Sequence, residues 1–397
     1  MTSRPIEPRY DPNSPVGVIS EAERHATPSP GIALCLSGGG YRAMLFHLGA
    51  LWRLQELGTL PKLQRVSSVS GGSIVAAQLA FRWREAVSTA GIAGFQSEVV
   101  VPIRRLAATS IDWKAVLRGI IGPGSVSDRV AGYYRKHLYG EATLQDLPTD
   151  GEGPRFVINA SNVQSGALWR FAKPYMADYR VGQVPRPKLS LATAVAASSA
   201  FPPVLSPCAL RLDQSDYTPG SGTDLQHEPF TTRVVLTDGG VYDNLGLETA
   251  WKRYRTILVA DGGGQMAADP RPSRDWLRHT KRVLDLVDNQ VRALRKRQVI
   301  SAYQLPRNPG DIAWRDGTYW GIRTNIADYG LPDPLSCPHV QTMKLAGVPT
   351  RLARLPDLTQ ERLINWGYAV CDAAMRRWVL PQAPRPSGFP YPAAAVG

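Results

Sequence analysis

Cysteine is scarce in this 397-residue chain. Its four cysteines, Cys35, Cys208, Cys337 and Cys371, are far apart in the sequence. No two of them have the CxxC spacing that is typical of zinc sites and redox-active disulfides, so we expect neither a metal site nor a disulfide framework. Four reduced thiols suit a reducing compartment.

Long apolar runs are also missing. No window approaches 18 apolar residues, and residues 1–15, MTSRPIEPRYDPNSP, lack the apolar core of a signal peptide. We therefore expect a cytoplasmic protein without a signal peptide or transmembrane segment, and we keep peripheral contact with a membrane as a hypothesis. Hydrophobic residues nevertheless make up 43% of the chain, which is enough for a large core.

The charge is strongly of one sign. Lys and Arg number 46 against 33 Asp and Glu, which gives a formal net charge of +13. Such an excess favours anionic partners, either nucleic acid or an anionic lipid surface. No helix-turn-helix, RNP or zinc pattern accompanies the charge, so we do not expect a nucleic-acid partner.

The chain divides into three parts by composition. Residues 1–30 are predicted to be an extended arm, residues 31–380 one domain, and residues 381–397 a loosely attached Pro-rich tail. Apolar strands that end in glycines alternate with helical segments, which indicates an α/β fold with a mostly parallel central sheet. The predicted strands are 32–36, 64–70, 155–163, 167–173, 233–238 and 255–260, and the predicted helices are 41–57, 73–87, 189–201 and 275–299.

The stretch VSSVSGGSIVAAQLA, residues 66–80, places serines between a strand and a helix. A nucleophile elbow needs compact residues two positions before and after its serine, because the strand and helix backbones pass close together there. Ser70 meets this requirement with Ser68 and Gly72, whereas Ser67 would lie in the strand and Ser73 in the helix. The alternative is a Ser/Gly-rich turn that caps a helix and has no chemistry.

A serine nucleophile needs a base within hydrogen-bonding reach. None of the six histidines has a strand-end context, and His47 is interpreted as a packed residue of the first helix. Asp238 follows an apolar strand and precedes two glycines, so we expect it at the sheet edge where α/β sites gather. The alternative is an ordinary turn aspartate. Asp261, in a second Asp-Gly-Gly, is interpreted as a loop cap.

The three glycines of LSGGGYR, Gly38 to Gly40, separate a strand from a helix. Their backbone N–H groups, together with the helix dipole, are suited to stabilising an oxyanion in acyl transfer. The alternative is a dinucleotide site, because Gly38, Gly40 and Ala43 match G-x-G-x-x-A. That motif also expects an acidic residue at the end of the next strand, and the segment SVSGGS has none.

Three motifs in this order, GGGYR at 38–42, SVSGG at 68–72 and DGGVYDNLG at 238–246, resemble the patatin-like phospholipase family. Residues 194–207 are similar to the small-residue helix of that family. The resemblance implies a three-layer α/β/α fold and hydrolysis of acyl esters of phospholipids or related lipids, with no metal and no cofactor. It also leaves a non-catalytic lipid-binding protein on the same fold as an alternative. One departure is Ser68, which stands where the family has Gly.

The resemblance also assigns roles to residues. It implies that Ser70 is the nucleophile and Asp238 its base. It implies an oxyanion hole of Gly38, Gly39, Gly40, Arg42 and Gly71, supported by Gly72, Gly239 and Gly240. For Arg42, orientation of the glycine loop is favoured over contact with a lipid phosphate.

Residues Asp275 to Val299 combine apolar positions at helical spacing with many basic residues. Such a helix could bind an anionic lipid surface. The favoured interpretation is a packed surface helix whose basic face is solvated.

Overall fold

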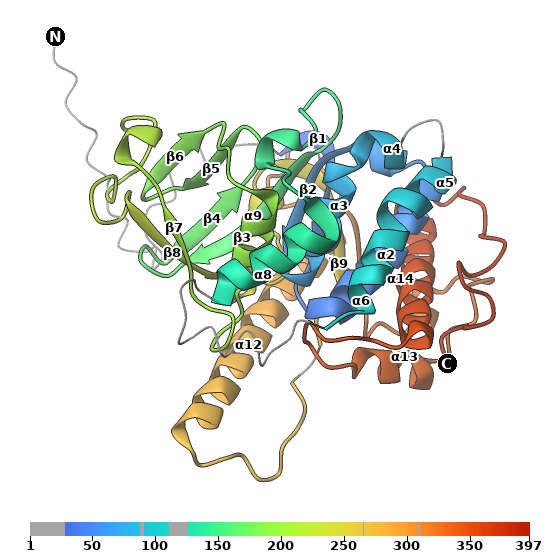
Figure 1. The fold of residues 1–397 in the computed structure, drawn as a ribbon. Coiled ribbons are helices and arrows are strands. Elements are labelled where there is room, and N and C mark those ends of the chain that lie inside the picture. Colours follow the sequence, from blue (N-terminus) through green and yellow to red (C-terminus); the bar gives the residue numbers. More distant parts are fainter. Residues whose placement is uncertain (1–27, 88–90, 111–125, 265, 309) are drawn as a thin grey trace.

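The computed structural model describes residues 28–87, 91–110, 126–264, 266–308 and 310–397. The predicted N-terminal arm therefore lies almost entirely outside the described residues. A ten-stranded sheet forms the centre of the domain, in the order β10-β9-β1-β2-β3-β4-β5-β6, with β8 paired to β3 and β7 paired to β8 (Figure 1).

Five strands run parallel: β1 (Ser29–Leu36), β2 (Leu63–Val69), β3 (Arg155–Asn162), β9 (Tyr254–Asp261) and β10 (Asp316–Gly321). β1 ends in a fully buried apolar run, Ala33 to Leu36, because helices cover both faces of the sheet there. The carboxyl ends of these strands share one edge, where the loops after β1, β2 and β9 meet.

The rest of the sheet is antiparallel and was not predicted as such. It contains β4 (Ala167–Phe171), β5 (Tyr175–Asp178), β6 (Gly182–Pro185), β7 (Cys208–Arg211) and β8 (Arg233–Asp238). β8 runs against β3 with Ala160 opposite Asp238, so the end of β8 reaches the edge where β2 also ends. This pairing brings Asp238 to the carboxyl end of β2.

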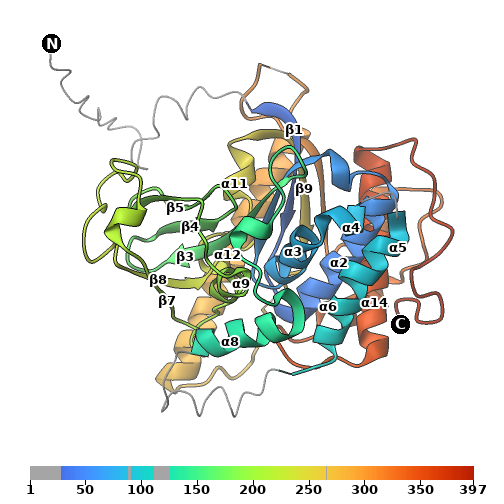
Figure 2. The same ribbon diagram turned by 45° about the horizontal axis from the view of Figure 1, so that its top comes forward.

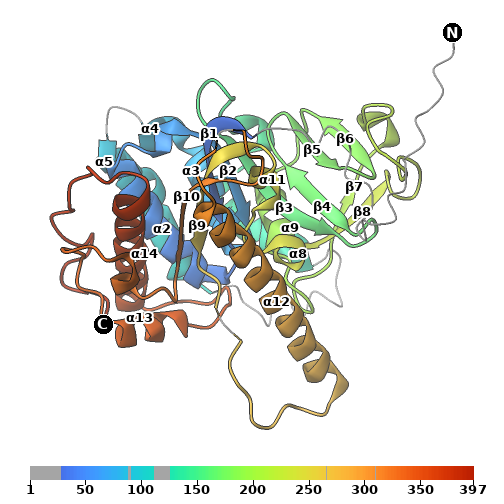
Figure 3. The same ribbon diagram turned by 180° about the vertical axis from the view of Figure 1, so that it is seen from behind.

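Helices cover both faces and give three layers, as expected. α2 (Gly40–Glu56), α3 (Gly71–Phe81) and α14 (Asp357–Trp378) cover one face, whereas α11 (Glu248–Trp251) and α12 (Trp276–Gln304) cover the other (Figure 3). The predicted helix 189–201 is shorter in the structure, as α9 (Leu191–Ser198), and lies between α3 and β8 (Figure 2). No described helix is long and apolar enough to cross a membrane.

The remaining helical elements are short, and several of them pack on the helices that cover the sheet. The α-helices are α4 (Trp83–Val87), α5 (Gly91–Phe95), α6 (Val101–Ala107), α8 (Val126–Tyr134), α10 (Gly240–Asp243) and α13 (His339–Ala346). The 3-10 and π turns are η1 (Leu60–Lys62), η2 (Gln96–Val100), η3 (Arg135–Tyr139), η4 (Leu144–Asp146), η5 (Gln214–Asp216) and η6 (Ile326–Tyr329).

The Pro-rich C-terminal segment is not loosely attached, which corrects the sequence prediction. Nδ2 of the buried Asn365 on α14 donates to the carbonyls of Tyr391 and Ala395, at 2.8 and 2.7 Å. Ala394 and Val396 are buried. An amide that is buried in the core needs these backbone partners, so the segment is held against α14.

Candidate active site

Ser70 lies at a sharp turn between β2, which ends at Val69, and α3, which begins at Gly71. Its backbone angles are φ 50° and ψ −120°, a region that side chains other than glycine rarely adopt. Backbone strain of this kind is typical of functional sites, and it is expected at a nucleophile elbow. The Ser70 N–H donates to the Ser198 hydroxyl at 3.0 Å, which helps to hold the strained turn.

The residues around this turn are closely packed, as a nucleophile elbow requires. A Cβ on Gly72 would lie 2.5 Å from the carbonyl oxygen of Leu36, and a Cβ on Gly71 would collide with the carbonyl of Gly40. Ser68, where the family has Gly, fits without distortion of the strand. It is buried, and its hydroxyl accepts a 3.0 Å hydrogen bond from Ser73.

Asp238 ends β8 and is buried. Its Oδ1 accepts the Gly240 N–H at 2.7 Å. No donor among the described residues has the distance and angle of a hydrogen bond to Oδ2. Burial raises the pKa of the carboxyl to about 7, although the Gly240 N–H and the nearby Ser70 hydroxyl lower it. The free oxygen and the raised pKa are what a general base near neutral pH needs, and catalytic hydrogen bonds often shorten only when substrate binds.

Ser198, at the end of α9, links the serine turn to the aspartate loop. Its hydroxyl accepts a hydrogen bond from the Ser70 N–H and lies 2.9 Å from the Ser73 hydroxyl. Its carbonyl accepts the Gly239 N–H at 3.3 Å. The carbonyl of Ala200, two residues later, accepts the Asp238 N–H at 3.0 Å. The sequence marked this segment only by its small residues, and nothing in the local pattern singles out Ser198.

The glycine loop lies directly beside Ser70. A Cβ on Gly38 would be 3.2 Å from the Ser70 Cβ. The Gly38 N–H is already used, because it donates to the backbone carbonyl and to Oδ1 of Asn244, at 3.1 and 3.0 Å. The N–H groups of Gly39, Gly40 and Gly71 have no acceptor among the described residues. Of the predicted donors, these three are therefore free to bind an oxyanion.

The side chain of Asn244 connects this loop to α12. Its Oδ1 accepts the Gly38 N–H, and its Nδ2 lies 3.3 Å from each carboxylate oxygen of Asp288. Burial raises the pKa of Asp288 to about 6, and the neighbouring Arg292 lowers it. Asn244 stands within the motif DGGVYDNLG, but Asp288 is 44 residues later, so no local pattern predicts this contact.

Replacement of Asn244 by Ala is expected to lower kcat by about 10- to 100-fold, less than the roughly 10²- to 10³-fold cost of removing an oxyanion donor itself, because Asn244 only supports the donor loop. The Gly38 N–H would lose its side-chain acceptor, and the glycine loop would lose its connection to α12. Steady-state kinetics on a soluble ester measures the effect. Asp288→Asn retains an acceptor for the Asn244 amide and serves as the matched control. An equal loss in both variants would contradict the positioning role of Asn244.

Arg42 is buried and faces backbone rather than the surface near Ser70. Its Nε donates to the Gly262 carbonyl at 3.1 Å, and its Nη1 donates to the Val348 carbonyl at 2.5 Å. Burial and the like charge of Arg292 lower its pKa to about 10. These contacts support the role in holding the glycine loop, because Gly262 lies against Gly39.

The other candidates from the sequence lie in structural positions. His47 is buried, its Nε2 contacts the Ser37 carbonyl at 2.9 Å, and burial lowers its pKa to about 4. Asp261 accepts the Tyr319 hydroxyl at 2.7 Å and the Gly263 N–H at 2.9 Å, as a loop cap does. Among the described residues, no cluster of His, Cys, Asp and Glu is arranged to bind a metal ion.

Comparison with known proteins gives a family and a fold. A family model described as patatin-like phospholipase matches residues 34–251. Human GIVD cytosolic phospholipase A2 aligns with a TM-score of 0.53 and 15% identity, over 90% of this chain and 61% of that one. Its complex with methyl gamma-linolenyl fluorophosphonate aligns with a TM-score of 0.50 and 15% identity, over 90% and 59%. This chain thus spans about three fifths of those structures. No curated protein sequence matches it significantly.

Proposed function

Because the chain belongs to the patatin-like phospholipase family, we propose that it hydrolyses fatty-acyl esters of phospholipids or related lipids through Ser70 and Asp238. One observation supports this most strongly. A serine with a strained backbone lies beside a glycine loop and near a buried carboxyl. Among the described residues, three N–H groups at this loop and turn have no acceptor, and Oδ2 of the carboxyl has no donor. Release of fatty acid from phospholipid vesicles by the purified protein at pH 8 tests it. Absence of release from all lipid classes would favour the non-catalytic alternative.

The proposed reaction proceeds by acyl transfer. Asp238 Oδ2 takes the proton of the Ser70 hydroxyl as Oγ forms a bond to the ester carbonyl carbon. The N–H groups of Gly39, Gly40 and Gly71 donate to the oxyanion of the tetrahedral intermediate. The intermediate collapses as the C–O bond to the alcohol breaks, and the alcohol takes the proton from Asp238. Water then attacks the carbonyl carbon of the acyl-serine while Asp238 accepts its proton. The fatty acid leaves as the bond between that carbon and Ser70 Oγ breaks, and Asp238 returns the proton to Oγ.

Three exposed apolar side chains lie on the segments that flank the proposed dyad. Phe201 and Val204 follow α9, and Val241 lies on α10 directly after the aspartate loop. An apolar rim next to a polar catalytic pair is suited to an acyl chain that leaves a lipid surface. α10 also packs against α12, so this rim lies near that helix.

The outer face of α12 is apolar and exposed. Trp276 is 78% exposed and Leu294 is 58% exposed, and Val283, Leu284 and Val287 lie between them at helical spacing. The N-terminal half of the helix projects from the rest of the domain (Figures 1 and 3). The favoured sequence interpretation, a packed helix, does not fit the exposures in the projecting half, whereas Val299 in the C-terminal half is buried.

The charge of α12 indicates what this face contacts. The helix contains seven Lys and Arg residues but only two Asp. Apolar side chains with flanking cations are typical of helices that lie in the interface of an anionic membrane. We therefore extend the proposal to peripheral docking of the protein on an anionic lipid surface through α12, with the proposed active site beside the docking face.

Replacement of both Trp276 and Val287 by Asp is expected to weaken binding to vesicles of phosphatidylcholine and phosphatidylglycerol at least tenfold, since two apolar side chains would no longer enter the interface. Co-sedimentation measures the partition. Val340→Asp is the matched control, because Val340 is 71% exposed on α13, away from α12. Unchanged partition of the double variant, or equal loss in the control, would rule out α12 as the docking face.

A further inference from the structure

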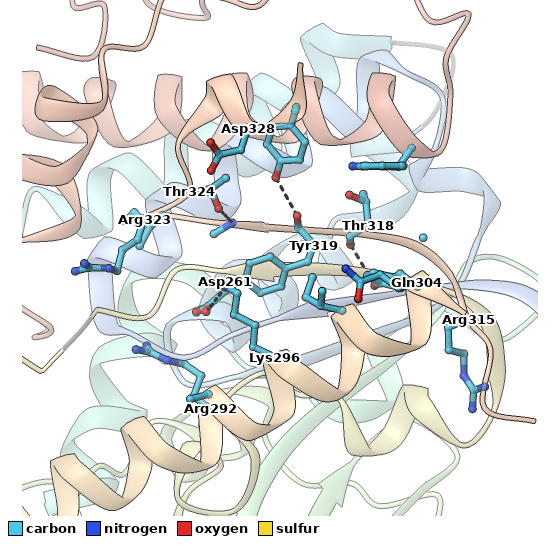
Figure 4. A pocket seen from close by; sticks show the side chains of 18 of the residues that line it. Asp261, Arg292, Lys296, Gln304, Arg315, Thr318, Tyr319, Arg323, Thr324 and Asp328 are labelled. Carbon is cyan, nitrogen blue, oxygen red and sulfur yellow. Dashed lines mark hydrogen bonds between the residues drawn. The ribbon is translucent and has the colours of Figure 1, made fainter. Parts of the chain in front are cut away.

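A second concave site lies between the C-terminal half of α12 and β10, the edge strand of the sheet (Figure 4). It is an open cleft of about 1100 Å³. Its walls come from α12, from β10, and from the turn that follows β10. Neither Ser70 nor Asp238 lines it, and none of Gly38, Gly39 and Gly40 does. The cleft is therefore separate from the proposed acyl-transfer site.

Cations from two elements face this cleft. Arg292 and Lys296 come from α12, and Arg323 from the turn after β10. Figure 4 shows Arg292 and Arg323 at the same end of the cleft, on either side of Asp261. Within the described part of the chain, neither Lys296 nor Arg323 forms an ion pair, and both are exposed. The Lys296 ammonium lies 4.6 Å from the centroid of the Tyr319 ring.

The carboxylates of the cleft are already engaged or lie at its margin. Asp261 accepts hydrogen bonds from the Tyr319 hydroxyl and the Gly263 N–H, at 2.7 and 2.9 Å. Asp316 pairs with Arg307 at 3.3 Å. Asp328 is exposed on η6. Among the described residues neither Lys296 nor Arg323 pairs with a carboxylate, and five Lys and Arg residues line the cleft against three Asp, which favours an anionic ligand.

The position of Arg292 makes the same end of the cleft suitable for a tetrahedral anion. Its guanidinium donates to the Gly264 carbonyl and lies 3.4 Å from the Asn289 Oδ1, which fixes its orientation. Arg323 reaches the same region from the opposite wall. Guanidinium groups from two sides, with an ammonium beside them, can donate to several oxygens of one phosphate.

We propose that this cleft is a second ligand site, which binds a phosphate-bearing anion through Arg292, Lys296 and Arg323. The aromatic side chains of Tyr319 and Trp314 in the same cleft offer apolar surface for the body of the ligand. The phosphate could belong to a soluble phosphorylated molecule or to the headgroup of a phosphomonoester lipid. The site does not depend on acyl transfer, so its test does not require turnover.

Isothermal titration calorimetry at fixed ionic strength tests the site with two probes, inorganic pyrophosphate and dihexanoyl phosphatidic acid below its micelle concentration. The full chain is expected to bind at least one probe with saturation. Lys296→Glu combined with Arg323→Glu is expected to raise Kd at least tenfold. Arg211→Glu, an exposed arginine on β7, is the control and is expected to change Kd less than twofold.

The two probes distinguish the sources of the phosphate. Tighter binding of pyrophosphate assigns the cleft to soluble phosphates, and tighter binding of the lipid assigns it to a headgroup. Circular dichroism and thermal melting confirm that the double variant is folded, and Arg323→Gln provides a milder second variant with a smaller expected loss. The proposal is overturned if the full chain binds neither probe, or if both sets of variants bind as tightly as the unaltered protein.

Discussion

Ser70→Ala is expected to abolish ester hydrolysis, with a loss of at least about 10⁴-fold in kcat, the order of magnitude seen when a serine nucleophile is removed. The proposed mechanism offers no second route to the acyl-enzyme, because the N–H groups of Gly39, Gly40 and Gly71, which have no acceptor among the described residues, lie beside this one serine. Release of p-nitrophenol from a soluble ester measures the loss without a lipid surface.

Ser73→Ala is the matched control for this variant. Ser73 lies three residues later in α3, is buried, and its hydroxyl contacts those of Ser68 and Ser198. Its loss removes hydrogen bonds beneath the turn but leaves the Ser70 hydroxyl in place, so a much smaller decrease is expected. Hydrolysis that persists in Ser70→Ala at a tenth of the original rate would exclude Ser70 as the nucleophile.

Asp238→Asn is expected to lower kcat/KM by about 10³- to 10⁴-fold, since an amide cannot accept the serine proton. In the unaltered protein the carboxyl must be ionised to act as a base, and its pKa lies at about 7 because it is buried. The rate should therefore fall about tenfold for each pH unit below 7 and level off above it. A pH profile that is flat from 5 to 8 would contradict this role.

The same raised pKa predicts that ionisation of Asp238, which raises the rate of hydrolysis, lowers the stability of the folded protein. The folded protein retains a proton on Asp238 between the ordinary carboxyl pKa and about 7, so its free energy of unfolding falls as the pH rises through that range. The cost above pH 7 is on the order of 4 kcal/mol. Asp238→Asn should therefore melt at a higher temperature than the unaltered protein at pH 8, and show no such gain at pH 4. Differential scanning calorimetry at both pH values separates the two outcomes.

The parts of the site that were predictable from sequence are those with a local pattern. The apolar run before Ser70 and the compact residues around it indicate a turn between a strand and a helix, and β2 and α3 meet there. The Gly-rich loop after β1 and the Asp-Gly-Gly that begins with the last residue of β8 are likewise visible in short windows. The catalytic roles of these residues remain predictions.

The parts that were missed depend on contacts between distant segments. The strands β5, β6 and β7 have four residues each, which is too short for a clear alternation of apolar and polar residues. The hydrogen bond from the Gly38 N–H to the side chain of Asn244 joins residues that are 206 positions apart, so no local motif contains it. The C-terminal segment is rich in proline, which is typical of a loose tail, whereas its attachment depends on contacts with residues distant in sequence, such as the buried Asn365 on α14.

The most direct test of the central claim is to locate the covalent adduct formed with a long-chain alkyl fluorophosphonate. Peptide mass spectrometry of the labelled full chain is expected to find one adduct, on Ser70, formed at a rate that follows the ionisation of Asp238 near pH 7. Asp238→Asn should slow its formation by orders of magnitude. An adduct on a different residue, or labelling of Ser70 at the same rate in Asp238→Asn, would contradict a serine activated directly by this carboxylate.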